Sequence, residues 1–174
     1  MLKTKDFALI GLYTALLIGG QIALSAISGV EIVTLLFASF CFYFGVMRGA
    51  ILGTAFSLMR CLVFGFFPAV LILYLIYYNI FAMVVGLIGK AMKGKINLKS
   101  TLIVLLTVFI LTALFTILDN IITPLFYAFS REATKAYMLA SLTALIPQEI
   151  CVLLTVGTLF PPLVKLLERI KSFK

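Results

Sequence analysis

Histidine is absent from all 174 residues of the chain. Its absence excludes a histidine-dependent metal site, a Ser-His hydrolase and a histidine proton relay. The sequence also has no G-x-x-x-x-G-K-[ST] loop for nucleotide phosphates and no G-x-S-x-G nucleophile elbow. We therefore expect a protein that is not an enzyme, binds no cofactor and does not hydrolyse ATP itself.

Charge is also scarce. Charged residues make up 11% of the chain and hydrophobic residues 64%, with a mean hydropathy of +1.25. A soluble domain is roughly 45–50% apolar and about 25% charged. The three cysteines lie singly in apolar runs, without the spacing of a metal site or a disulfide framework. The composition predicts an integral membrane protein.

Six apolar segments approach the roughly 20 residues that a helix needs to cross the hydrocarbon layer. They predict an all-α fold, an integral membrane bundle of six transmembrane helices that forms a single domain over residues 1–174. The second and third segments are the shortest. The predicted spans are 7–27, 31–46, 49–64, 68–89, 101–123 and 137–163.

Basic residues are distributed unevenly between the loops that join these spans. If both termini are cytoplasmic, eleven Lys and Arg residues lie inside and only Arg131 and Lys135 lie outside, with Arg60 within the third span. An excess of basic residues in cytoplasmic loops is the usual orientation signal. The charges therefore predict cytoplasmic termini and an even number of crossings.

Polar side chains gather in the outer half of the predicted bundle. An ionisable group in a bilayer costs a few kcal/mol, so it usually faces the interior or a wet cavity. The three acids of this set outnumber its single arginine, which favours an outward-facing pocket for a polar small molecule. The alternatives are an internal network, in which Arg60 pairs with Glu31 or Asp119, and an interfacial belt for the tyrosines. The predicted substrate-binding residues are Glu31, Arg60, Tyr74, Tyr78, Asn79, Asp119, Asn120, Gln148 and Glu149.

The first span has small residues at every fourth position: Gly11, Ala15, Gly19 and Ala23. Positions four apart share one helix face, so these residues form a shallow groove, called here the small-residue stripe. In lipid, such faces let another helix approach closely. The stripe predicts either packing within the bundle or docking of a separate protein.

A six-helix chain of this size with such a first helix resembles the substrate-binding S component of energy-coupling factor (ECF) transporters. In that family an alanine-xxx-alanine motif on the first helix faces a transmembrane T component. Here Gly11-Leu-Tyr-Thr-Ala15 and Ala15-Leu-Leu-Ile-Gly19 stand in that place, with glycine at two positions. The resemblance implies a multi-pass protein of a prokaryotic plasma membrane that takes up a vitamin or related micronutrient.

The resemblance further implies a binding site built from helices four to six, below the loop that joins helices one and two. It implies a T component and two separate ATPase subunits as partners, and a loaded S component that topples in the membrane on docking. The acids favour a ligand that is rich in hydrogen-bond donors or positively charged. The lack of tryptophan argues against a thiamin-type stacking site.

Two other functions remain open from the sequence. One is a self-sufficient carrier of small solutes, coupled to protons through Asp119 or Glu149. The other is an assembly or scaffold protein without a small ligand.

Overall fold

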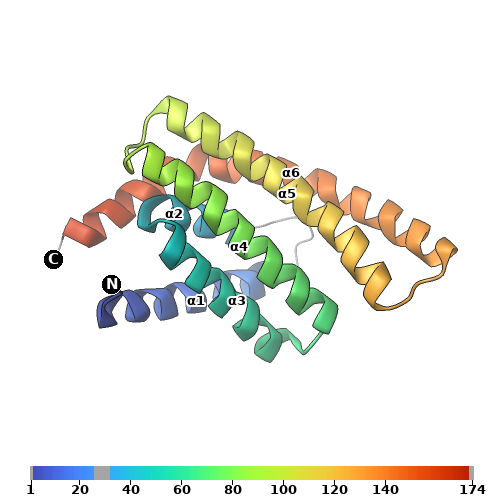
Figure 1. The fold of residues 1–174 in the computed structure, drawn as a ribbon. Coiled ribbons are helices and arrows are strands. Elements are labelled where there is room, and N and C mark those ends of the chain that lie inside the picture. Colours follow the sequence, from blue (N-terminus) through green and yellow to red (C-terminus); the bar gives the residue numbers. More distant parts are fainter. Residues whose placement is uncertain (1, 26–31, 173–174) are drawn as a thin grey trace.

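A computed structural model describes residues 2–25 and 32–172, with side chains up to residue 169. Within these ranges the backbone forms six α-helices and no strand, so the all-α prediction is confirmed (Figure 1). The helices are α1 (Thr4–Leu24), α2 (Val33–Phe44), α3 (Val46–Phe64), α4 (Pro68–Ala91), α5 (Leu98–Phe126) and α6 (Arg131–Ser172).

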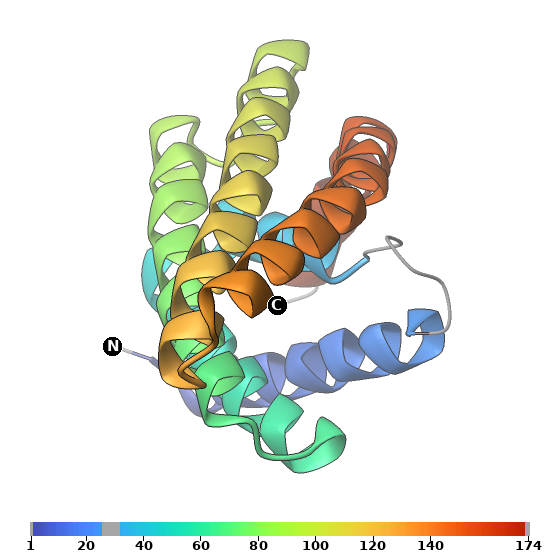
Figure 2. The same ribbon diagram turned by 90° about the vertical axis from the view of Figure 1, so that its right-hand side faces the viewer.

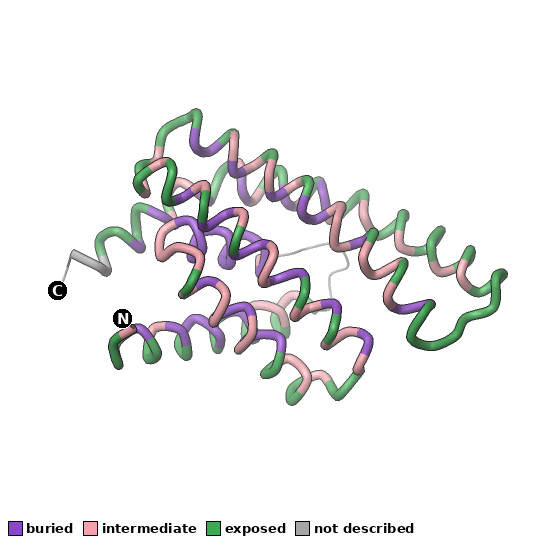
Figure 3. The backbone as a smooth tube through the Cα atoms, in the orientation of Figure 1, coloured by how far each residue is buried: buried purple, intermediate pink, exposed green. Residues whose placement is uncertain are grey.

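Five of the described helices, α1, α3, α4, α5 and α6, are long and apolar enough to cross a membrane. They carry large apolar side chains on their surfaces, such as Leu12 (70% exposed), Leu62 (79%) and Leu125 (79%). Exposed positions recur along their outer faces, while buried positions face the centre (Figure 3). Soluble proteins rarely expose apolar surface on this scale. The described helices therefore fit a multi-pass membrane protein.

The segment predicted as the second span is shorter than expected. Its helix, α2, has 12 residues, which corresponds to about 18 Å against a hydrocarbon core of about 30 Å. Every residue from 33 to 42 is buried, and α2 contacts all five other described helices. A helix that is apolar all round belongs in the interior. Its role as a sixth crossing thus stays a prediction.

Glycine and proline set several helix boundaries. Gly45, with φ of 84°, alone separates α2 from α3, so α3 begins three residues before the predicted span. Glycine adopts this left-handed conformation without steric cost. Pro68 occupies the first turn of α4 as predicted. In contrast, α5 continues past Pro124, where the predicted span stops, and ends at Phe126.

Among the described helices, α1 and α6 both contact α2 but do not contact each other. In the described part of the chain, α1 contacts α2 and α3 but not α4, α5 or α6, whereas α6 contacts α5 and α2. Viewed from the end that carries the α5–α6 link, α1 lies apart from α6 (Figure 2). The start of α1, the α4–α5 turn and the end of α6 lie at the opposite end (Figure 1). An even number of crossings requires this arrangement of the chain ends.

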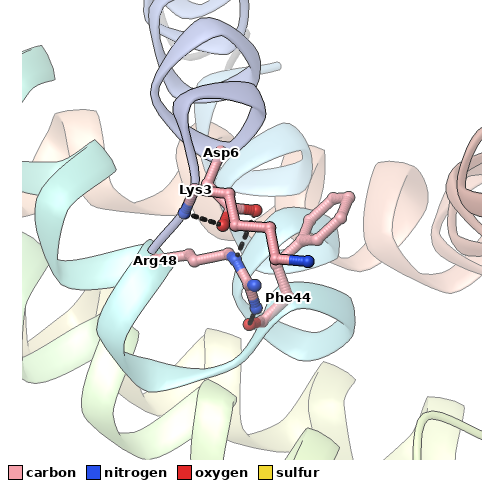
Figure 4. Close-up of polar contacts among 4 residues, drawn as sticks. All are labelled: Lys3, Asp6, Phe44 and Arg48. Atoms are coloured by element: carbon pink, nitrogen blue, oxygen red, sulfur yellow. Dashed lines mark hydrogen bonds and ion pairs between the residues drawn. The ribbon is translucent and has the colours of Figure 1, made fainter. Parts of the chain in front are cut away.

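An ion pair holds the start of α1 against the α2–α3 joint (Figure 4). Arg48 donates from Nε to Asp6 Oδ1 at 3.0 Å and from Nη1 to the Phe44 carbonyl oxygen at 3.4 Å. The other carboxylate oxygen of Asp6 accepts the Lys3 backbone N–H at 2.9 Å. A carboxylate in the first turn also interacts favourably with the helix dipole.

The end of α4 packs directly on the backbone of the α2–α3 joint. A side chain at Gly89 would collide with the carbonyl oxygen of Phe42, and a Cβ at Gly86 would lie 2.6 Å from the backbone nitrogen of Val46. Small residues permit such close approach of helices in a membrane, where van der Waals packing replaces the hydrophobic effect. Gly89 and Gly86 therefore make this packing possible.

We predict that Gly89→Ala lowers the free energy of unfolding by about 1–3 kcal/mol, because the added methyl has no room beside a backbone carbonyl. Denaturant titration of the detergent-solubilised protein, followed by circular dichroism, measures the change. Gly157→Ala on α6 is the matched control, since a methyl there would meet nothing within 4 Å. Equal stability of the two variants would contradict the prediction.

Candidate functional site

Two neighbouring residues of α5, Asp119 and Asn120, form hydrogen bonds to α6. The Tyr137 hydroxyl donates to Asp119 Oδ2 at 2.6 Å, and the Ser141 hydroxyl donates to Asn120 Oδ1 at 2.8 Å. Within α5, the Thr123 hydroxyl donates to Asp119 Oδ1 at 2.6 Å. These bonds tie the two helices together in the half of the bundle that carries the α5–α6 link.

A pocket of about 240 Å³ lies beside these bonds, between α5 and α6. We call it the α5–α6 pocket. A carboxylate has about four lone-pair sites, so Asp119 retains acceptor capacity after its two bonds to Thr123 and Tyr137. The pocket can therefore accept hydrogen bonds from a small polar molecule. Its lining residues are Phe115, Thr116, Asp119, Tyr137, Ala140, Ser141, Ala144 and Gln148.

An aromatic cluster on α4 adjoins this pocket through Phe115. The Phe115 ring centroid lies 5.7 Å from that of Tyr74 and 4.9 Å from that of Tyr77. Tyr78 lies 5.3 Å from Tyr74 and 4.8 Å from Phe37 of α2, and it is buried. These contacts place the tyrosines inside the bundle rather than in an exposed belt. Tyr74 and Tyr77 thus stand behind the Phe115 wall of the pocket.

Arg60 stacks on the same cluster. Its guanidinium carbon lies 4.4 Å from the Tyr74 ring centroid and 5.3 Å from that of Phe64. Cation–π contacts of this kind are worth about 0.5–2 kcal/mol, depending on desolvation. Its Nε is buried without a hydrogen-bond acceptor among the described residues. The predicted alternative of an Arg60–Asp119 pair is not found, since Asp119 bonds to hydroxyls. Glu31 lies outside the described residues.

Asn79 lies apart from the α5–α6 pocket. Its amide nitrogen donates to Thr54 Oγ1 at 3.3 Å and to the Leu75 carbonyl at 2.8 Å. It lines a shallow, mainly apolar groove of about 380 Å³ together with residues of α3, among them Ala50 and Ala55. Asn79 therefore joins α3 to α4 here and takes no part in the pocket beside Asp119.

The two polar residues after Pro147 differ in environment. Gln148 lines the α5–α6 pocket. Glu149 is not among the described residues that line this pocket, and it is only 8% exposed. Neighbouring residues on a helix point about 100° apart, so Gln148 and Glu149 face different surroundings. The structure thus brings Asp119 and Gln148 into one pocket, with Asn120 bonded to its wall and Tyr74 beside it.

The sequence reading missed Tyr137 and Ser141, which supply hydroxyls to the pocket. Their spacing of four residues puts them on one helix face, and this spacing is the signal that could have identified them. Tyr137 marks the start of the predicted sixth span, but α6 begins six residues earlier, at Arg131. Among the described residues, no three Cys, Asp or Glu side chains gather in a way that could hold a metal ion.

The small-residue stripe faces away from its own bundle. Gly11, Ala15, Gly19 and Ala23 are all exposed, and a methyl group added at Gly11 or Gly19 would meet nothing within 4 Å. The buried face of α1 is formed by other residues: Asp6, Ile10, Tyr13, Thr14, Leu17 and Ile18. Packing of the stripe within the bundle is therefore not observed in the described part of the chain.

Comparisons with protein-family models, with curated proteins and with solved structures found no match to this chain. The site is therefore interpreted from its own geometry.

We predict that the Tyr137–Asp119 bond stabilises the α5–α6 pair. Polar bonds between membrane helices average about 0.6 kcal/mol and reach about 1.7 kcal/mol. A double-mutant cycle of Tyr137→Phe and Asp119→Ala, read by denaturant unfolding in detergent, should give a coupling energy in this range. Tyr127→Phe, at a 43% exposed tyrosine in the α5–α6 link, is the control and should not couple to Asp119→Ala. Equal coupling of both tyrosines to Asp119 would refute the assignment.

Proposed function

We propose that this chain is the substrate-binding S component of an ECF-type importer in a prokaryotic plasma membrane. In this proposal the chain crosses the membrane six times, with both termini cytoplasmic. It captures a vitamin or related micronutrient from outside, and a separate T component and two ATPase subunits power the uptake. One observation carries the proposal: the stripe on α1 faces out of the bundle, while the polar pocket lies between two helices that α1 does not touch.

The exposure of the stripe supports a partner that is itself a membrane protein. Leu12 and Leu16, which are 70% and 49% exposed, flank the small residues. A neighbouring helix can approach the α1 backbone between such side chains, and close packing is the main source of helix association in lipid. The T component supplies helices of this kind in the family that the sequence resembles.

The chemistry of the α5–α6 pocket supports a small polar ligand. Asp119 and Gln148 offer acceptors, and the hydroxyls of Tyr137 and Ser141, which already donate to Asp119 and Asn120, can accept as well. A pocket with these groups suits a ligand rich in hydrogen-bond donors or carrying positive charge, and it disfavours a dicarboxylate. The aromatic wall at Phe115, with Tyr74 and Tyr77 packed behind it, supports a ring in the ligand.

The distribution of charge supports the orientation. Arg131 and Lys135 lie in the first turns of α6, at the end with the α5–α6 link. The lysines of the α4–α5 turn and the start of α1 lie at the opposite end. The positive-inside rule assigns this lysine-rich end to the cytoplasm. The α5–α6 pocket then opens toward the outer half of the membrane.

We predict that Ala15→Leu abolishes assembly and preserves ligand binding. Leucine would fill the stripe, and overpacking costs about 1–3 kcal/mol, so co-purification of the partners should fall about tenfold or more. The measurement is affinity purification of the tagged chain from its native membranes, with mass-spectrometric identification of one membrane protein and ATPases that carry nucleotide-binding loops. Ala136→Leu, at an exposed position on α6 outside the stripe, is the control and should assemble normally.

The converse prediction concerns the acids. Asp119→Asn combined with Glu149→Gln should release the ligand, because the charged hydrogen bond that Asp119 offers in the pocket is lost, which costs about 1.5–3 kcal/mol, or about tenfold or more in affinity. Native mass spectrometry of the purified protein should detect a bound metabolite in the wild type and not in this variant. Assembly should persist in the variant, and Glu132→Gln, at an exposed acid, should retain the metabolite.

Two results would reject the proposal. Uptake by liposomes that contain only this chain, driven by a pH gradient, would establish the rival carrier. Unchanged function in the double acid variant, with loss of function in Ala15→Leu alone, would establish a scaffold.

A further inference from the structure

A second, larger pocket of about 740 Å³ opens at the lysine-rich end of the bundle, and we call it the basic pocket. It is distinct from the α5–α6 pocket and shares no lining residue with it. Its walls come from the end of α2, the α2–α3 joint, the end of α4, the α4–α5 turn and one residue of α6. Nothing in the proposed function uses it.

The charge of this pocket is strongly asymmetric. Lys90, Lys93 and Lys95 line it, whereas Glu168 is the only acid among its described lining residues. Four charged side chains thus meet around one hollow in a chain that is only 11% charged. The excess of cations selects an anion.

The lysines are held on a defined turn rather than on a free loop. Backbone N–H groups of Gly94 and Lys95 donate to the carbonyls of Gly89 and Met92 at 2.9 and 3.0 Å. Lys93 adopts φ of 53°, next to Gly94 at 67°. A left-handed conformation costs a side-chain-bearing residue roughly 1–2 kcal/mol, and glycine would avoid that cost. The turn therefore keeps a cation in a position where glycine would be more stable.

The floor of the basic pocket is formed by the close contact between α4 and α2. Gly89 lies against the Phe42 carbonyl, and both residues line the pocket. Phe44 and Ile96 add half-buried apolar surface, and Tyr43 adds a ring with a hydroxyl. The hollow therefore combines cationic and apolar walls.

Apolar surface continues from the basic pocket along the outside of the bundle. Leu87 lies one helical turn before Lys90 and is 53% exposed, and Leu98, at the start of α5, is 76% exposed. A soluble anion would make no contact with this apolar surface, whereas the acyl chains of a lipid would cover it. The occupant that matches both features is a phospholipid with an anionic head group.

We propose that the basic pocket binds the phosphate-bearing head group of an anionic phospholipid, with its acyl chains along α4 and α5. Basic pockets between membrane helices on the cytoplasmic side suit such head groups. The lysines pair with the phosphate, and Glu168 sets a limit on the affinity. This inference needs only that the helices lie in a membrane, so it stands or fails separately from the S-component proposal.

The test is native mass spectrometry of the full chain in detergent, titrated with phosphatidylglycerol or phosphatidylcholine of matched acyl chains. We expect phosphatidylglycerol to bind at lower concentration. Each lysine near an anionic lipid contributes roughly a fivefold factor. Lys90→Gln, Lys93→Gln and Lys95→Gln together should therefore lower the affinity for phosphatidylglycerol by at least about tenfold, and leave phosphatidylcholine unchanged. Glu168→Gln should raise the affinity for phosphatidylglycerol, a gain that misfolding cannot produce.

The matched control removes three cations outside the basic pocket, with Lys5→Gln, Lys99→Gln and Lys165→Gln combined. It should retain the preference for phosphatidylglycerol. Equal losses in both triple variants would mean that net charge alone attracts the lipid, and would overturn the proposal. Competition by free glycerol 3-phosphate at equal concentration would identify a soluble phosphate as the occupant and would also overturn it.

Discussion

Gly89 lies against the Phe42 carbonyl, and Gly86 lies next to the backbone nitrogen of Val46. These contacts bring the backbone of α4 onto the α2–α3 joint, where Gly45 alone connects the two helices. The position of α4 then determines what lies at each end of the bundle. Its last turn supplies the floor and first lysine of the basic pocket, and its middle carries the tyrosines that stand behind Phe115. Without this close approach, the basic pocket would lose its floor, and Phe115 would lose the tyrosines packed behind it.

The central position of α2 follows from the same packing. A helix of 12 residues with every position from 33 to 42 buried has no face left for lipid. It separates α1 from the α5–α6 pair, which leaves the outer face of α1 without a neighbour in the described chain. The stripe and the α5–α6 pocket are therefore separated by the packing of the bundle. On the proposed function, this separation allows docking and ligand binding to change independently.

The sequence located the long helices because hydrophobicity is the dominant signal in a membrane chain, where every backbone polar group must be satisfied within the helix. The length of α2 was overestimated, because the apolar run 31–46 does not reveal which of its residues are buried among five neighbouring helices. The predicted fifth span also stopped before Pro124, although α5 continues to Phe126. Proline inside a membrane helix is tolerated when its surroundings compensate, and those surroundings are not local in sequence.

The sequence predicted several residues of the candidate site, but it did not predict their hydrogen-bond partners. Asp119 and Gln148 do share a pocket, but the alternative network paired Asp119 with Arg60, whereas its donors in the structure are Tyr137 and Thr123. Which hydroxyl meets which carboxylate depends on the rotation of α5 against α6. Asn79 illustrates the same limit, because it lies in the middle of α4 as predicted, while its side chain donates to Thr54 of α3. The position of a residue along a helix can be predicted from the sequence, whereas the rotation of the helix requires the packed bundle.

The packed centre also bears on mechanism. Phe37, Phe40, Phe56 and Phe81 are completely buried between the two ends of the bundle, and Tyr78 packs edge-on against Phe37 and Phe56. In the part of the chain that the structure describes, these close-packed rings fill the centre of the bundle, as expected of protein interiors, which contain few voids larger than water. On the proposed function, a ligand held beside Asp119 therefore reaches the other side only if the bundle rearranges or moves as a body. Movement as a body preserves the backbone contacts at Gly86 and Gly89, whereas opening the centre would break them. On the proposed function, the energy for that movement comes from the partner that docks on α1.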